Sequence, residues 1–159
     1  MLPEQTPITG REDIKGAPPP LRALIEFYDA FNNRDMAKMS NNWARTAEIS
    51  MDNPVGGIKR GWEEIGAVYE LIFNGPARVY VEFYDYTLHE TDRMFYAVGR
   101  ERGRFSIGET AIDLAIRTTR IYKLIDGHWR QVHHHGSIDD PEALARYQSA
   151  VSKRTRPSV

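Results

Sequence analysis

The sequence predicts an α+β fold in which helices cover one face of a curved, mostly antiparallel sheet. Helical patterns come first in the chain, and long alternating strand patterns fill its second half. The last two strands are joined by the tight-turn dipeptide Asp126-Gly127. Helices followed by a run of strands are typical of an α+β domain, whereas a parallel α/β sheet would show them in alternation. At 159 residues the chain suits one such domain.

Residues 1–20 are expected to form a flexible N-terminal arm. The segment is rich in proline and glycine and ends in the proline run 18–20, a composition that resists regular structure and suits a mobile or draped segment. A domain over 21–138 follows. The last part, 139–159, is predicted to hold a C-terminal helix and a frayed basic tail from Lys153.

The elements of the domain are predicted from the spacing of apolar residues. These recur at helical spacing from Leu21, and Asp35 is a suitable N-cap for a short second helix. Alternation of apolar and polar residues predicts the strands. In chain order we expect helices near 21–33 and 34–43, a strand over 47–52, a helix over 61–73, strands over 79–89, 94–104, 110–125 and 128–137, and a last helix over 141–150.

The hairpin around Asp126-Gly127 has a fixed register if its strands pair regularly. Counted outward from the turn, Tyr122 then lies opposite Gln131, and Arg120 opposite His133. One face of the hairpin is therefore apolar near the turn and polar at its far end, which is typical of a pocket wall. In order from the turn, that face carries Leu124, Trp129, Tyr122, Gln131, Arg120, His133, Thr118 and His135.

The run from His133 to His135 is also compatible with a solvated strand edge. Three consecutive strand residues cannot all point the same way, so only His133 and His135 share a side. No carboxylate lies nearby in the sequence at a suitable spacing, and we therefore predict no metal site. The chain has no cysteine, which excludes disulfides, thiolate metal sites and cysteine nucleophiles. We expect no cofactor.

The charge and hydropathy of the sequence limit the kinds of binding partner that it predicts. The net charge is -1, and the lysines and arginines are scattered among nearly as many acids, so nothing predicts nucleic-acid binding. No apolar run approaches membrane-spanning length, and the first residues lack the apolar core of a signal peptide. We therefore expect a cytoplasmic protein that binds neither nucleic acid nor membrane.

Two features resemble a known family. The order of elements, with Arg60-Gly61-Trp62 opening the third helix, and the run from Thr119 to His135 are similar to the nuclear transport factor 2-like superfamily. Within it the chain looks most like SnoaL-like proteins and the association domain of calcium/calmodulin-dependent protein kinase II, over Leu21 to Ile138. The resemblance implies a cone, in which a strongly curved sheet wraps around three N-terminal helices and encloses a cavity. It also implies dimerisation through the sheet.

The resemblance further implies arginines inside the cavity. Arg120 corresponds to one of them, and Arg100 lies where the preceding strand would supply a second. A third arginine of the association domain is replaced by Gly136.

The leading hypothesis is an internal cone pocket that binds a small carboxylate or other anionic ligand. Arg100 and Arg120 would anchor it, because a guanidinium matches a carboxylate with two parallel hydrogen bonds. Alternatively, either arginine is structural and is neutralised by an internal acid such as Glu101, Glu109 or Asp52. The other residues expected to line the pocket are Tyr122, Trp129, Gln131, His133, His135 and Trp62.

Two further functions stay open. An isomerase, cyclase or dehydratase would need a general acid or base, for which Asp52 and His133 are the candidates. The segment Asp52-Asn53-Pro54 is equally compatible with an ordinary turn in which Asp52 has no catalytic role. The third class is an oligomerisation module. We also expect a homodimer through the outer face of the sheet, which would otherwise expose a large apolar patch.

Overall fold

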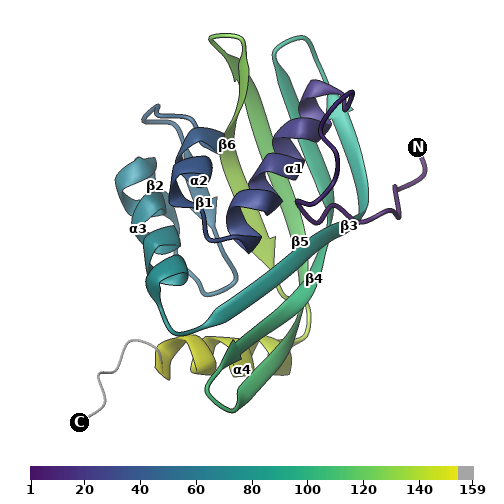
Figure 1. The fold of residues 1–159 in the computed structure, drawn as a ribbon. Coiled ribbons are helices and arrows are strands. Elements are labelled where there is room, and N and C mark those ends of the chain that lie inside the picture. Colours follow the sequence, from purple (N-terminus) through teal and green to yellow (C-terminus); the bar gives the residue numbers. More distant parts are fainter. Residues whose placement is uncertain (154–159) are drawn as a thin grey trace.

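The computed structural model describes residues 1–153 (Figure 1). The predicted basic tail after Lys153 lies outside the described residues. Within them, six strands form a sheet in the order β2-β1-β6-β5-β4-β3, accompanied by four helices. The elements are α1 (Pro19–Asn32), α2 (Met36–Asn42), β1 (Ser50–Asp52), β2 (Lys59–Arg60), α3 (Gly61–Asn74), β3 (Arg78–Glu90), β4 (Met94–Ile107), β5 (Thr110–Ile125), β6 (His128–Ser137) and α4 (Pro141–Lys153). No helix of this part of the chain is long and apolar enough to cross a membrane.

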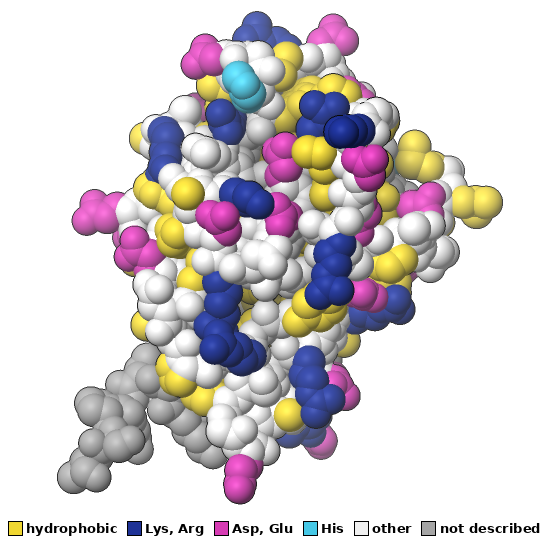
Figure 2. Space-filling view, viewed as in Figure 1, with side chains coloured by type: hydrophobic (Ala, Val, Ile, Leu, Met, Phe, Trp, Pro, Cys, Tyr) yellow, Lys and Arg dark blue, Asp and Glu magenta, His cyan; other side chains and the backbone are white. Residues whose placement is uncertain are grey.

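The helices cover one face of the sheet, as the sequence predicts. Strands β3 to β6 form an antiparallel meander, and β1 adds to β6 in parallel. Figure 1 shows α1, α2 and α3 on the same side of the curved sheet, with α4 across its lower end. The predicted α+β fold is therefore confirmed. On the face shown in Figure 2, basic and acidic side chains are interspersed rather than gathered into a patch of one sign.

The sheet bends where β3 and β4 lose their regular register. The pairing shifts between Tyr84 and Thr87, and Asp85 takes a positive φ of 49°. Gly99 of β4 stands beside this irregularity, where an added Cβ would lie 2.6 Å from the Cβ of Tyr86. A bulge next to a glycine lets two strands twist sharply, and the sheet therefore curves around the helices.

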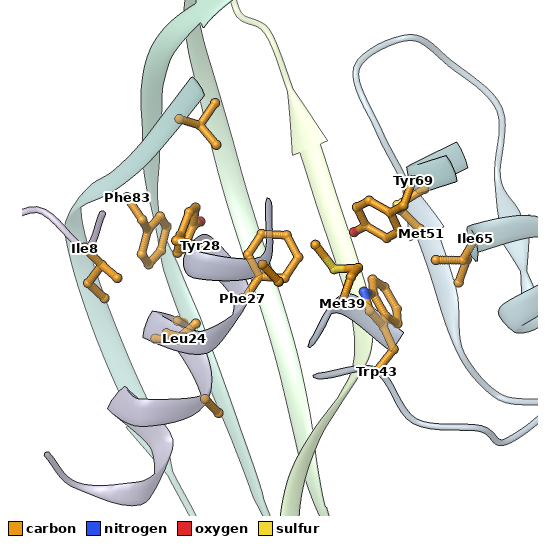
Figure 3. Close-up of a cluster of buried hydrophobic side chains, with 14 of the residues drawn as sticks. Ile8, Leu24, Phe27, Tyr28, Met39, Trp43, Met51, Ile65, Tyr69 and Phe83 are labelled. Atoms are coloured by element: carbon orange, nitrogen blue, oxygen red, sulfur yellow. The ribbon is translucent and has the colours of Figure 1, made fainter. Parts of the chain in front are cut away.

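Helix α1 supplies the centre of the core. Prolines occupy its first turn, where a missing amide hydrogen costs no helical bond. Phe27 and Tyr28 are at most 2% exposed. Figure 3 shows Tyr28 against Phe83 of β3, with 5.8 Å between the ring centroids, and Phe27 on the side of Tyr69 from α3. Each buried side chain of this kind stabilises the fold by about 1.5–3 kcal/mol.

The N-terminal arm, residues 1–18, is draped along the edge of the sheet, and the predicted boundary at residue 20 falls inside α1. Glu4 and Ile8 form isolated antiparallel bridges with β3, and the side chain of Ile8 is buried. Gly10 takes a φ of +87°, and an added Cβ there would lie 2.2 Å from the amide nitrogen of Asp29 in α1. Of the two alternatives for this segment, the structure supports the draped arm, which covers part of the otherwise open edge of β3.

The hairpin of β5 and β6 contains a bulge that the sequence did not indicate. Asp126 and Gly127 both take positive φ values, as a type I′ turn requires. Pairing follows the predicted register as far as Tyr122 and Gln131, and one extra residue of β6, Val132, then interrupts it. Beyond the bulge, Ile121 pairs with His133, Arg120 with His134, and Thr119 with His135.

The bulge overturns the predicted placement of two histidines. Because Val132 shifts the alternation of β6 by one residue, His134 joins Arg120 on the inner face, while His133 and His135 turn to the outer face. The prediction that His133 and His135 share a face with Arg120 is wrong. The physical reason is burial, since Gln131 and Val132 are consecutive and both face the interior, at 0% and 7% exposure.

Candidate functional site

A cavity of about 300 Å³ lies between the helices and the inner face of the sheet. Its lining is mostly apolar and comes from α1, α3, α4, the six strands and the loop between β1 and β2. The walls include Phe27, Val68, Val81, Phe105, Ile116 and Tyr147. This volume is at the small end of the range for small-molecule pockets. The cavity can therefore hold a small and largely apolar molecule.

The polar floor of this cavity consists of Arg120, Glu101 and His134. Arg120 is 2% exposed, and its Nη2 donates to Oε1 of Glu101 at 2.7 Å. Its Nη1 donates to Oε1 of Gln131 at 3.0 Å, and its Nε donates to the hydroxyl of Tyr28 at 3.2 Å. The charge of Arg120 is thus balanced inside the protein.

The surroundings of Arg120 keep it charged. Burial opposes the charge, but the hydroxyl of Tyr28 and the carboxylate of Glu101 outweigh this cost and raise the pKa of Arg120 above its ordinary value. The guanidinium also lies 3.5 Å from the ring centroid of Phe27, in cation–π contact. Burial raises the pKa of Tyr69, which lines the same cavity, to about 12, so that its hydroxyl stays neutral.

Two polar atoms of the floor receive no hydrogen bond from residues 1–153, and of these two only the oxygen of Glu101 is open to a ligand. Oε1 of Glu101 accepts from both Arg120 and Tyr28, the latter at 2.6 Å, but its Oε2 receives no hydrogen bond from residues 1–153. The Nδ1 of His134 is buried and likewise has no partner among these residues. Burial, helped by the charge of Arg120, holds the pKa of His134 well below its ordinary value, and the imidazole is therefore neutral.

Arg100 does not enter the cavity, so the prediction that it joins Arg120 there is wrong. In the pairing of β4 with β5, Arg120 faces Ala97. Residues 97, 99 and 101 therefore point inward, and Arg100 points outward. Its side chain is 52% exposed and its Nε donates to Oδ2 of Asp85 at 3.2 Å. The inward charged residue of β4 is Glu101, which the sequence suggested only as an acid that might neutralise an arginine.

The predicted aromatic residues lie around the core rather than on the cavity wall. Tyr122 is fully buried, and its hydroxyl donates to Oδ1 of Asn42 at 3.1 Å. Trp129 is half-buried and packs edge-on against Phe95, with 5.1 Å between the ring centroids. Trp62 is also half-buried and lies under the guanidinium of Arg45.

A second cluster forms on the outer face of the sheet. The parallel pairing of β1 with β6 places Asp52 beside His135 and Ser50 beside His133. Oδ2 of Asp52 lies 3.3 Å from Nδ1 of His135, and the hydroxyl of Ser50 lies 2.8 Å from Nδ1 of His133. The two residues suggested as a general acid or base, Asp52 and His133, thus lie together, but outside the cavity. No feature of the sequence indicates a parallel contact across such a separation.

Comparison with known proteins shows which family this architecture represents. The model of the SnoaL-like domain matches residues 21–141, which is most of the chain. The chain belongs to the SnoaL-like family. No curated protein matches it.

Solved structures share the SnoaL-like fold of this protein. A candidate calcium/calmodulin-dependent protein kinase type II association domain from Thiobacillus denitrificans is 25% identical, with a TM-score of 0.62 over 77% of this chain and 97% of that chain. A candidate dehydratase of the NTF2-like family from Streptomyces avermitilis is 20% identical, with a TM-score of 0.66 over 75% and 92%. A ketosteroid isomerase-like protein from Erwinia carotovora atroseptica is 17% identical, with a TM-score of 0.61 over 75% and 92%.

Proposed function

We propose that this SnoaL-like protein binds a small, neutral and largely apolar molecule in the cavity, with a hydroxyl group donating to Glu101. One observation carries the proposal. Oε2 of Glu101 lies at the polar floor of an otherwise apolar cavity and has no hydrogen-bond donor among residues 1–153. This oxygen is not fully enclosed, so a ligand hydroxyl in the cavity would supply the donor that residues 1–153 do not.

The same floor argues against the anionic ligand expected from the sequence. That expectation rested on Arg100 and Arg120 acting together, but Arg100 lies on the outer face and Arg120 is paired with Glu101. At this floor a ligand carboxylate would therefore meet the carboxylate of Glu101, and the other cation of the lining, Lys59, belongs to β2 rather than to the floor. Two carboxylates in one buried site repel each other unless one takes up a proton.

Proton transfer is the second candidate function. A carboxylate with a free oxygen in an apolar cavity is a suitable general base, because water is largely excluded from the site. The structures of similar fold include a candidate dehydratase and a ketosteroid isomerase-like protein. The fold alone does not select a chemistry. In this chain Glu101 takes the place of Asp52 and His133 as the candidate base, because only Glu101 lines the cavity.

The test compares 2-naphthol with 2-naphthoate, which share a ring system and differ in the polar group. Calorimetry should show binding of the naphthol and not of the naphthoate at neutral pH. Glu101→Gln removes the acceptor charge and leaves Arg120 unbalanced, so the naphthol should bind at least about tenfold more weakly while the naphthoate gains affinity. Glu109→Gln is the control, since Glu109 is exposed in the turn between β4 and β5.

A cavity-filling variant separates binding in the cavity from binding elsewhere. Val68 of α3 lines the cavity wall and is not one of the residues of the polar floor. Val68→Trp should abolish binding of the naphthol and leave the contacts of Glu101 intact. Naphthol binding that survives Val68→Trp, or that is equally weak in Glu101→Gln and Glu109→Gln, would rule out the proposed site.

A further inference from the structure

The outer face of the sheet carries a side-chain cluster that the cavity does not use. We propose that Asp52, His133 and His135 bind a divalent transition-metal ion of the zinc or cobalt type. Their ligand atoms all lie within 4.8 Å of one another. This site is separate from the cavity, and its test is independent of the function proposed there.

The backbone brings the three residues to one face. In the parallel pairing of β1 and β6, Asp52 stands opposite His135, and His133 is two residues away on the same side of β6. The bulge at Val132 is required for this arrangement, because regular pairing would turn both histidines toward the interior. The two strands therefore present one carboxylate and two imidazoles to the same point.

The distances match a small coordination sphere. Nδ1 of His135 and Oδ2 of Asp52 are 3.3 Å apart. Two ligands each about 2.0–2.1 Å from a tetrahedral zinc ion lie roughly 3.3 Å apart, so this pair already has the spacing of two metal ligands. His133 supplies the third ligand atom, which lies within 4.8 Å of the other two, so a rotation of its side chain would bring it into the same coordination sphere.

The donor set selects the class of metal. Two imidazole nitrogens and one carboxylate oxygen suit zinc, cobalt, nickel or ferrous iron, whereas calcium and magnesium prefer oxygen ligands throughout. Three protein ligands leave further coordination positions open to water, as in catalytic rather than structural zinc sites. The neighbouring cations Arg100 and Arg117 are each paired with an aspartate, Asp85 and Asp139, so their charges are partly balanced.

Ser50 is the positioning residue of the site. Its hydroxyl lies 2.8 Å from Nδ1 of His133, which leaves Nε2 of His133 to face the metal. A hydrogen bond to the second ring nitrogen is the usual way in which proteins orient a metal-binding imidazole. His135 would bind through Nδ1, the atom that already faces Asp52.

The test is a calorimetric titration of the full, tag-free chain with zinc ions at neutral pH. One zinc ion per chain should bind with a micromolar dissociation constant. Asp52→Asn, His133→Ala and His135→Ala should each weaken binding by at least about 100-fold, and Ser50→Ala by about tenfold. The control is His128→Ala, because His128 is an exposed histidine at the hairpin turn, away from the cluster, and its loss should change nothing.

A second measurement does not depend on the variants being folded. Cobalt added to the unaltered chain should give visible absorption bands with the intensity of four- or five-coordinate cobalt. Added zinc should displace the cobalt and abolish these bands. Histidine side-chain NMR should show zinc-dependent shifts of His133 and His135 and none of His128. Saturable binding weaker than about 1 mM, less than one ion per chain, or an equal loss in His128→Ala and His133→Ala would overturn the proposal.

Discussion

The buried pair of Arg120 and Glu101 gives the sharpest prediction about stability. Arg120→Met and Glu101→Leu each leave the other charge buried without a partner. Both side chains are nearly inaccessible, at 3% and 6% exposure, and they are 2.7 Å apart. Breaking a buried pair from one side costs about 3–5 kcal/mol, and we expect each single variant to lose that much of its free energy of unfolding.

The double variant should lose much less than the sum of the two single variants. With both charges gone, two groups lose their partners. The hydroxyl of Tyr28 loses its acceptor Glu101 and its donor Arg120, and Oε1 of Gln131 loses its donor Arg120. Apolar replacement of a whole buried ion pair is often neutral or stabilising. The coupling energy between the two positions should therefore reach several kcal/mol, at the upper end of what contacting residues show.

Urea unfolding followed by tryptophan fluorescence measures this cycle, and thermal unfolding gives a second estimate. For a chain of this size, 3–5 kcal/mol corresponds to a fall in melting temperature of roughly 6–20 °C. The exposed pair of Arg117 and Asp139 is the control, with 2.6 Å between its charged atoms but 60% and 56% exposure, and its loss should cost less than about 1 kcal/mol. Single-variant losses at 101 and 120 as small as this control, or additive losses in the double variant, would refute the reasoning.

Three further predictions concern the arm, the core and the outer face. Burial would raise the pKa of Glu12, but hydrogen bonds from the amide and hydroxyl of Thr9 outweigh it and lower that pKa. Glu12 therefore stabilises the fold above the unfolded pKa near 4.3, and Glu12→Gln should cost about 0.5–1 kcal/mol in urea unfolding at pH 7 and almost nothing near pH 3. Trp43 is 1% exposed, so Trp43→Ala should cost about 3–5 kcal/mol, and Trp129→Ala clearly less, by the same assay. Val98 is 43% exposed on the outer face. We predict that the chain forms a homodimer through this face and that Val98→Glu makes it a monomer, as light scattering would show.

The fold could be predicted from the sequence because the features that indicate its elements are local. Helical spacing after the proline run, the N-cap at Asp35 and the turn at Asp126-Gly127 each depend on neighbouring residues, and the structure has all three. Asp35 accepts a hydrogen bond from the amide of Lys38, as an N-cap should. The short strand β2 was not predicted, because two residues are too few to show alternation.

The sequence predicted the candidate site only in part, because the site depends on which alternate residues of each strand face the interior. Arg120 was placed inside correctly, since the count from the turn holds on β5. On β4 the alternation is misleading, because Met94, Tyr96 and Val98 are apolar but 36–43% exposed. The buried positions are Phe95, Ala97 and Glu101, so the face that carries Arg100 points outward. The bulge at Val132 left no such signal, because neither Val132 nor its neighbours is a residue type that marks a bulge.

The bulge at Val132 explains why one strand can serve two sites. A regular hairpin would place His133 and His135 beside Arg120, adding two imidazoles to a floor that already holds a balanced ion pair, and would leave His134 outside. With one extra residue, β6 gives the cavity a single neutral imidazole and gives the outer face two histidines beside Asp52. Because His134 lies between the two proposed metal ligands, the single extra residue at Val132 decides which side chains of β6 reach the cavity and which reach the outer face.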